Sequence, residues 1–293
     1  MALPAKPPLA SSYTANVVLV ILTLFPGLIN TSAIALAAPV IGADLGVPAN
    51  LAAALPLMSD AALAFGCVLG AEIARRISRR VAYFWLIAIS LVTSLASAAA
   101  PSFTVLVAAH VVHGLVAGML FIVILPPLLT AFGGAKLSAT ASVMVPALFG
   151  AATLGPPLGG LVAAPHLWRA IFAAEVVVAA IAYLMAPFVL ERSDPPAAAD
   201  PIDWYALILA AAGSSFVYVG VGMLAGSDWH NPVAIGSVAA GLACYAALIA
   251  GEAVKRKPLA PVRELAASVA LVGAIATVVG SAAFSALVQG LQL

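Results

Sequence analysis

The sequence predicts an all-α membrane protein, a polytopic helix bundle with about nine transmembrane helices, and three observations lead to this prediction. First, 64% of the 293 residues are hydrophobic and 8% are charged, with a mean hydropathy of +1.16, far from the composition of a soluble domain. Second, apolar runs of about 20 residues recur, the length that crosses a bilayer core of about 30 Å as a helix. Third, Lys and Arg concentrate in alternate connecting segments.

The predicted helices fall into three groups along the chain. Residues 1–200 hold six of them, an N-terminal transmembrane bundle that ends in the polar, proline-containing stretch from Glu191 to Asp203. Residues 201–264 hold two further helices and a basic loop. Residues 265–293 hold a ninth helix, and because that helix has no following partner we expect a fragment or a truncated product. The segments are 17–41, 51–71, 81–100, 104–129, 139–163, 169–190, 203–225, 233–253 and 266–289.

The basic residues predict the orientation of these helices, because Lys and Arg of short loops stay on the cytoplasmic side. With a cytoplasmic N-terminus, Arg169 alone falls on the other side. We therefore predict an integral protein of a bacterial-type inner membrane, with its N-terminus inside. The residues assigned to the cytoplasmic side are Lys6, Arg75, Arg76, Arg79, Arg80, Lys136, Arg192, Lys255, Arg256, Lys257 and Arg263.

Glycines and prolines indicate where helices approach closely or bend. Pairs of glycines four residues apart let two helix backbones come together, which is how helices associate in lipid. At Gly155-Pro156-Pro157 the prolines lack a backbone donor and clash with the preceding turn, so we expect the fifth helix to bend or break there. The glycine pairs are Gly66 with Gly70, Gly114 with Gly118, and Gly155 with Gly159.

Polar side chains from several helices are predicted to share one layer inside the bilayer. At a rise of about 1.5 Å per residue they lie about 9 to 13 Å from the outer face, at the level of the Gly155-Pro156 break. Polar and ionisable groups are costly in hydrocarbon and therefore mark functional candidates. We expect this layer to surround a cavity that opens at some stage to the exterior. Its members are Asn30, Asp60, His110, His113 and Glu175.

Each of these side chains also has a purely structural explanation. Asp60 suits a neutral, hydrogen-bonded acid as well as a proton-binding one. Glu175 lies nearer the interface, where we expect a solvated position at the cavity mouth. His110 and His113 share a helix face and suit hydrogen bonding between helices, as Asn30 does. No third ligand stands at a spacing that would complete a metal site around the two histidines.

The chain is not expected to be an enzyme. No nucleophile, base and orienting group stand at a usable spacing. We also expect no cofactor, no metal and no nucleic acid. The expected partners are a small-molecule substrate, protons and the lipid bilayer, and the sequence leaves the oligomeric state open.

Several motifs resemble those of one transporter family. Gly155-Pro156-Pro157-Leu158-Gly159-Gly160 resembles the antiporter signature G-P-x-x-G-G, and Trp168-Arg169-Ala170-Ile171-Phe172 follows at the expected distance. The stretch from Asn30 to Pro39 is similar to a D-x-T…A-L-P motif. Together they resemble the major facilitator superfamily, in particular its fourteen-helix drug:proton antiporter branch. Asp203-Trp204, which opens the seventh helix after a short linker, favours fourteen helices over twelve.

The resemblance implies a secondary transporter that works by alternating access and exports small lipophilic or cationic compounds in exchange for protons, as in multidrug efflux. It also implies a major-facilitator-like N-terminal bundle of six helices in residues 1–200, two linker helices in residues 201–264, and the first helix of an apparently truncated C-terminal bundle in residues 265–293. The alternative is a transport-incompetent half-transporter or a membrane interaction protein. The substrate-cavity candidates are Asn30, Ser32, His113, Gly155 and Pro156. The conformational-gating candidates are Arg76, Arg79, Arg80, Gly155, Pro156, Gly159 and Gly160.

This sequence departs from the family's pattern where proton coupling is concerned. Asn30 stands at the family's helix-1 Asp, His110 at its helix-4 Arg and His113 at the usual Gln. In the loop motif, Arg75 stands at the Asp and Ser78 at the second Gly. These changes leave two alternatives open, a rearranged proton relay or no relay. The proton-coupling candidates are Asp60, Glu175, His110 and His113.

Overall fold

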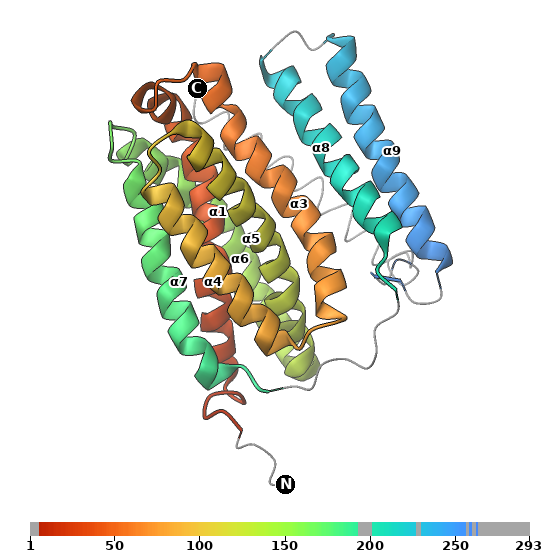
Figure 1. Ribbon diagram of the computed structural model, residues 1–293. Helices are drawn as coiled ribbons and strands as arrows, with labels where there is room; N and C mark the ends of the chain where they lie inside the picture. The colour runs from red at the N-terminus through yellow and green to blue at the C-terminus, as the bar shows by residue number, and fades with distance from the viewer. Residues whose placement is uncertain (1–5, 193–200, 227–229, 256–257, 260–261, 263–293) are drawn as a thin grey trace.

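The computed structural model describes residues 6–192, 201–226, 230–255, 258–259 and 262 (Figure 1). Within these residues there are eight long helices and the short α2, and no strand, which confirms the predicted all-α fold. The helices are α1 (Tyr13–Asp44), α2 (Ala49–Ala52), α3 (Ala54–Ala74), α4 (Arg79–Ala98), α5 (Phe103–Ala131), α6 (Gly133–Leu161), α7 (Arg169–Val189), α8 (Trp204–Gly226) and α9 (Pro232–Val254).

The long helices match the predicted membrane spans. In the described part of the chain, eight spans are long and apolar enough to cross a membrane, and α2 and α3 together make one of them, Ala49–Ala74. The first eight predicted segments coincide with these spans to within a few residues at each end. The ninth predicted segment, 266–289, lies outside the described residues.

Capping side chains decide where several helices begin. Ser12 Oγ accepts a hydrogen bond from Ala15 N–H, so α1 begins before the apolar run that predicted it. Ser102 caps α5 in the same way, and Asn231 accepts two backbone N–H groups at the start of α9. Each cap satisfies backbone donors that the first helical turn leaves without a partner.

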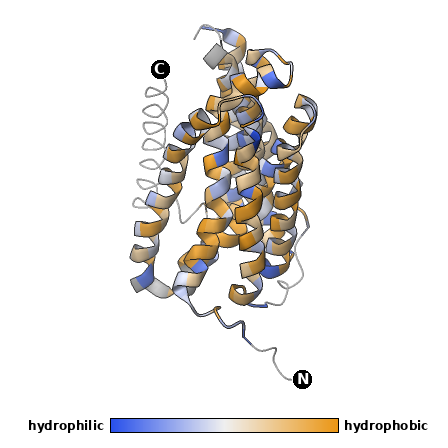
Figure 2. Cartoon of the chain, turned by 90° about the vertical axis from the view of Figure 1, so that its left-hand side faces the viewer, coloured by the Kyte–Doolittle hydropathy of each residue, from blue (hydrophilic) through white to orange (hydrophobic). Residues whose placement is uncertain are grey.

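Large apolar side chains cover the outside of the bundle. Trp85, Leu161 and Leu184 are 68%, 75% and 67% exposed. Figure 2 shows hydrophobic residues along most of the flank of the helices. A surface of this kind is stable against lipid chains and not against water, because water would have to solvate large contiguous apolar areas.

Successive long helices run in opposite directions, so the charged loops gather at two ends. Among the described residues, every Lys and Arg except Arg169 lies at the end where α1 begins, which we call the basic end; the other end is the far end. The described basic residues other than Arg169 therefore share one end of the bundle, as the sequence predicted. Which side of a membrane each end faces stays a prediction.

One buried carboxylate ties the helices together at the far end. Asp44, the last residue of α1, accepts hydrogen bonds from Trp168 Nε1 and from Arg169 Nη1, both at 2.8 Å. Arg169 Nη2 also donates to Ala100 O, between α4 and α5, at 3.0 Å. Arg169 thus turns toward α1 and away from Glu175, which stands on another face of α7.

The packing order of the helices places α1 at the centre of the first six spans. α1 packs against α5, α6 and α7, and α5 packs against α3 and α4. α6 and α7 both lie against α1 but barely touch each other. The α8–α9 hairpin meets the rest of the bundle through α3 (Figure 1).

Glycines account for the close approach of two helix pairs. A Cβ at Gly66, Gly114 or Gly118 would overlap backbone atoms of the opposite helix in the α3–α5 pair. Gly155 and Gly159 meet α1 equally closely, at Ser32 and Ala33. Close packing is therefore what these glycines provide.

The proline motif of the fifth span does not interrupt its helix. α6 continues as a helix through Pro156 and Pro157 to Leu161, so of the predicted bend or break the break is wrong. Gly155 and Gly159, beside the prolines, let this stretch pack closely on α1, and close packing on a neighbouring helix keeps a proline-containing segment helical.

Adding one methyl group at the α3–α5 interface is expected to destabilise the bundle. Gly118→Ala places its Cβ against Leu63 O, so the two backbones have to separate, at a cost of about 1 to 3 kcal/mol. Thermal unfolding of the purified protein in detergent measures the loss. The control is Gly236→Ala, where a Cβ meets no atom within 4 Å. Equal midpoints for the two variants would contradict the close-packing role.

Candidate functional site

Three polar side chains from three helices meet in the middle of the bundle. Glu175 of α7 lies with its Oε1 3.0 Å from His113 Nε2 of α5, and its Oε2 accepts a hydrogen bond from Asn30 Nδ2 of α1. Glu175 is only 5% exposed. The predicted solvated position of Glu175 at a cavity mouth is therefore wrong, because the face of α7 that carries it turns inward.

The sequence of α7 explains why that face is buried. The buried positions of α7 after Glu175 include Ala179, Ala182 and Ala186, at helical spacing, and Phe172 precedes it on the same stripe. Small side chains let α7 approach α1 and α4 closely. A glutamate on that stripe must face its neighbours across the interface, and it meets Asn30 and His113 there.

The other ring nitrogen of His113 faces two hydroxyl groups of α4. Nδ1 lies 3.4 Å from Thr93 Oγ1 and 3.3 Å from Ser94 Oγ. The sequence analysis did not single out these residues. A signal for them exists, because Ser90, Thr93, Ser94 and Ser97 form a polar stripe on an otherwise apolar helix, and all four are buried.

His110 lies beside the cluster and stacks on His113. The two rings are parallel to within 3°, with centroids 6.3 Å apart, and Phe172 contacts His110 edge-on at 5.7 Å. Neither ring nitrogen of His110 has a hydrogen-bond partner among the described residues, and neither has Asn30 Oδ1. A buried polar atom left without a hydrogen bond costs about 1 to 3 kcal/mol, so these atoms require a partner such as a water molecule.

A small cavity adjoins the same cluster. It measures about 20 Å³, enough for one water molecule, and it is lined by residues of five helices that include Thr23, Ser90, His113 and Glu175. The cavity provides a place where a water molecule can reach both the imidazole and the carboxylate.

The charges of this cluster restrict its protonation states. An ionised carboxylate buried without a partner costs several kcal/mol, so Glu175 must be paired with a cation or carry a proton itself. The imidazole of His113 is the group that can pair with it at this distance. The two groups together are neutral with one proton, positive with two and negative with none, which is the chemistry of a proton-binding site.

Other predicted residues lie elsewhere. Asp60 of α3 is close enough to Tyr218 of α8 to interact with it electrostatically, and it has no hydrogen bond or ion pair within the described ranges. Ser32 Oγ donates to Leu28 O of its own helix. Neither Ser32 nor Gly155 lines a cavity beside Glu175. The structure thus brings together Asn30, His110, His113 and Glu175, and separates Asp60 from them.

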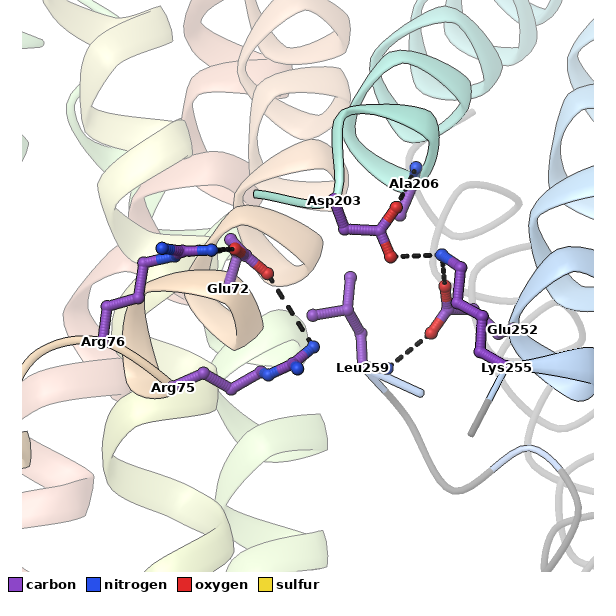
Figure 3. A network of polar contacts seen from close by, with 8 residues as sticks. All are labelled: Glu72, Arg75, Arg76, Asp203, Ala206, Glu252, Lys255 and Leu259. Carbon is purple, nitrogen blue, oxygen red and sulfur yellow. Dashed lines mark hydrogen bonds and ion pairs between the residues drawn. The ribbon is translucent and has the colours of Figure 1, made fainter. Parts of the chain in front are cut away.

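At the basic end, a buried glutamate that the sequence analysis missed pairs with Arg76, one of the predicted gating residues, and lies near Arg75. Glu72, 4% exposed, accepts a hydrogen bond from Arg76 Nε at 2.7 Å and lies 4.0 Å from Arg75 Nη1 (Figure 3). Glu72 therefore balances basic charge at the end of α3. Its spacing of four residues from Arg76 is the signal that could have found it.

The remaining gating arginines join this segment to other helices. Arg80 Nη1 donates to Leu190 O, just after α7, at 2.6 Å. Arg79 Nη2 reaches Ile124 O of α5 at 3.5 Å. The start of α4 is therefore fixed to both α5 and α7 at the basic end.

A second charge network closes the α8–α9 hairpin. Lys255, after α9, donates hydrogen bonds to Asp203, before α8, and to Glu252 (Figure 3). Asp203 Oδ1 also accepts the backbone N–H of Ala206 at 3.1 Å, which caps α8. This network lies next to the Glu72 pair in Figure 3, and Arg75 and Glu252 line one cavity of about 810 Å³.

The bundle of apolar helices around a buried polar cluster defines an integral membrane protein with the architecture of a secondary transporter. Residues 20–291 match the Major Facilitator Superfamily, and the chain belongs to that family of transporters. Proteins of this kind sit in a lipid bilayer and bind small-molecule substrates.

One curated relative of this chain is a drug-resistance protein. Over 132 residues the chain is 33% identical to the Lincomycin resistance protein of Streptomyces lincolnensis. The match covers 45% of this chain and 27% of that protein, so the chain spans about a quarter of the relative's length.

The charge network of Asp203, Glu252 and Lys255, which we call the α8–α9 clasp, is expected to make the stability of the protein depend on pH. Burial alone would raise the pKa of Asp203, but the hydrogen bond and charge of Lys255 hold that pKa below its usual value. Burial alone would lower the pKa of Lys255, and Asp203 and Glu252 raise it instead. The clasp is therefore fully formed above the unfolded pKa of Asp, about 3.9, and below that of Lys, about 10.4.

The measurement is the difference in thermal midpoint between the wild type and Asp203→Asn. We expect wild type to be more stable by a constant amount between about pH 5 and 9, and the difference to shrink below about pH 4 as Asp203 protonates and above about pH 10 as Lys255 loses its proton. Glu191→Gln, which removes an exposed ion pair with Lys6, is the control with little effect. A difference that does not change with pH would contradict the clasp.

Proposed function

We propose that this chain belongs to a proton-coupled exporter of small lipophilic or cationic compounds, in which Glu175 and His113 bind the transported proton. The observation that carries the proposal is the buried pair itself, a carboxylate and an imidazole 3.0 Å apart at the meeting point of α1, α5 and α7. The match to a drug-resistance protein supports export of a drug-like compound. The motifs around Gly155 support the fourteen-helix branch as the closest type.

The geometry supports a relay that replaces the family's usual residues. Asn30 stands where an acid is usual, and Glu175 brings a carboxylate to the same point from α7. His113 supplies the proton carrier, with His110 stacked beside it. A second proton would neutralise Glu175 while His113 stays charged, and Asn30 would then lose its charged acceptor, which loosens α1 from α7.

Proton coupling supplies energy for export. One elementary charge that moves down a membrane potential of 100 mV releases about 2.3 kcal/mol, which applies when the exported compound is neutral, and a pH gradient adds to it. Exchange of one proton for one monovalent cation moves no net charge, so the pH gradient alone drives that exchange. In alternating access, the two halves of the transporter rock around a central site, and protons enter as the substrate leaves.

The basic end supports a gate that must open and close during this cycle. Arg79 and Arg80 fix the start of α4 to α5 and to the end of α7, and Arg76 pairs with Glu72 within the α3–α4 segment. The face of α6 that carries Gly155, Pro156, Gly159 and Gly160 lies against α1 and gives a smooth surface for small helix movements. These contacts are the ones that a change between inward-open and outward-open states has to rearrange.

Glu175→Gln and His113→Gln are expected to abolish substrate-induced proton flux. Each variant removes one of the two proton-binding groups, so flux should fall at least about tenfold, equivalent to about 1.4 kcal/mol. A pH-sensitive dye inside liposomes that contain the purified chain measures the flux when lincomycin or another lipophilic compound is added. Glu191→Gln, an exposed acid, is the control.

The variant Asp60→Asn tests which of two carboxylates, Asp60 or Glu175, binds the transported proton. Because Asp60 lies apart from the His113 cluster, its amide variant should keep proton flux. Lost flux in Asp60→Asn together with normal flux in Glu175→Gln would place the relay on α3 and overturn the proposal.

A further inference from the structure

Two buried hydroxyl groups of α4 face the imidazole of His113 at the nitrogen that Glu175 does not contact. Nδ1 lies 3.4 Å from Thr93 Oγ1 and 3.3 Å from Ser94 Oγ, whereas Nε2 lies 3.0 Å from Glu175 Oε1. Thr93 and Ser94 are only 8% and 1% exposed. The two ring nitrogens therefore have different environments, with hydroxyl groups at one and a carboxylate at the other.

The hydroxyl group of Thr93 is arranged to accept a hydrogen bond from Nδ1. A threonine hydroxyl has one hydrogen and two lone pairs. That hydrogen is donated within α4, because Thr93 Oγ1 lies 2.9 Å from Ile89 O and 3.0 Å from Ser90 O, closer than it lies to His113. Only lone pairs remain toward the ring, so Nδ1 has to supply the hydrogen. Ser94 Oγ, which has no other hydrogen-bond partner in the described part of the chain, offers a second acceptor there.

The charge balance of the His113–Glu175 pair places the same requirement on Nδ1. Burial favours forms of the pair that carry no net charge. In one such form the imidazole holds both of its hydrogens and the carboxylate is ionised. In the other, Glu175 holds the proton and faces the lone pair of Nε2. Nδ1 carries a hydrogen in both forms, and the proton that changes place is the one at Nε2 and Oε1.

Nε2 is also the nitrogen from which a proton can leave. It lies close to Oε1 but makes no aligned hydrogen bond among the described residues. His113 and Glu175 both line the small cavity, which fits one water molecule. A proton on Nε2 can therefore pass to the carboxylate or to water.

Few other titratable groups act on this ring. His110 of α5 stacks on it, and Asn30 of α1 binds the second oxygen of Glu175. On α3, Asp60 lies toward Tyr218 of α8. The contacts of α4 with the ring come from uncharged hydroxyl groups. These hydroxyl groups are thus what distinguishes one ring nitrogen from the other on the side away from the carboxylate.

We propose that Thr93 and Ser94 are positioning residues that fix a hydrogen on His113 Nδ1, so that the proton that binds and leaves is the one at Nε2, facing Glu175. The choice of nitrogen follows from the contacts of the ring, whereas its use in transport rests on the proposed proton-binding role of the pair. With Nδ1 occupied, the one position on the imidazole that can take up a proton faces the carboxylate.

Nitrogen-15 NMR of the ring nitrogens tests this proposal directly. The full chain is labelled with nitrogen-15 histidine and placed in lipid nanodiscs, and the signals of His113 are identified by their loss in His113→Gln. Protonated and unprotonated ring nitrogens differ strongly in chemical shift, and couplings to the ring hydrogens tell Nδ1 from Nε2. From about pH 5 to about pH 8 we expect Nδ1 to keep its hydrogen and any change with pH to appear at Nε2.

Removal of both acceptors should release this preference. In the double variant Thr93→Val with Ser94→Ala, a hydrogen on Nδ1 would be buried without a partner. The ratio of the Nδ1-protonated to the Nε2-protonated neutral ring should therefore fall on the order of tenfold. Thr93→Ser with Ser94→Thr keeps both hydroxyl groups and should give the wild-type signals. The control is Ser97→Ala, which removes a buried hydroxyl of α4 that has no hydrogen-bond partner within the described residues.

Proton flux in liposomes gives a second measurement. If the pair carries the transported proton, half-maximal flux in the double variant should need a pH about one unit lower, because the charged imidazole then buries an N–H without an acceptor. The hydroxyl-keeping variant and Ser97→Ala should keep the wild-type pH profile.

The outcomes separate this inference from the proposed function. An unprotonated Nδ1 in the wild type overturns the inference, even if the double variant does not fold. Unchanged signals of His113 in a folded double variant also overturn it, whatever the flux measurements give. A protonated Nδ1 together with normal flux in Glu175→Gln and His113→Gln keeps the positioning role and overturns the proton relay.

Discussion

A carboxylate surrounded by apolar helices has to be neutralised, and this requirement connects the parts of the molecule that matter for function. Glu175 is almost fully buried, and the free energy of leaving its charge unpaired would amount to several kcal/mol. His113 and Asn30 supply what it needs, which requires α1, α5 and α7 to meet at one level. Any rotation of one of these helices would separate the partners, so the pair and the helix packing depend on each other.

Small side chains make that meeting possible. Alanines on α7 and glycines on α3, α5 and α6 let the backbones approach closely, while the large apolar side chains point outward to the lipid. Lipid does not drive helices together as water does, so association depends on close packing and on polar contacts between helices. Asp44 at the far end and Arg80 at the basic end add such polar contacts at the two ends of the bundle.

The sequence predicted the membrane spans well, but it predicted less well which side chains of different helices contact one another, and the reason is physical. Hydropathy and charge are properties of short segments, so the first eight spans and the common end of the basic residues follow from local composition. The depth of Asn30, His113 and Glu175 also follows, because it depends only on the helical rise. Which side chains face one another depends on the rotation of each helix about its axis, and tertiary packing sets that rotation. Asp60, at the same depth, therefore lies near Tyr218 of α8 and not in the Glu175 cluster. For the same reason the sequence analysis missed Glu72 and Ser94. The proline motif misled because the fit of α6 on α1 outweighs the local cost of two prolines.

The position of Glu175 gives one carboxylate access to two different environments. On one side it borders the small polar cavity with His113, Ser90 and Thr23, which a water molecule fits. On the other side it ends an apolar groove that is open between α6 and α7. Among the described residues that line the groove, Glu175 has no second polar group beside it, so the groups that balance its charge are His113 and Asn30. The charge state of Glu175 therefore depends on whether His113 carries a proton, because a buried carboxylate needs a cation beside it.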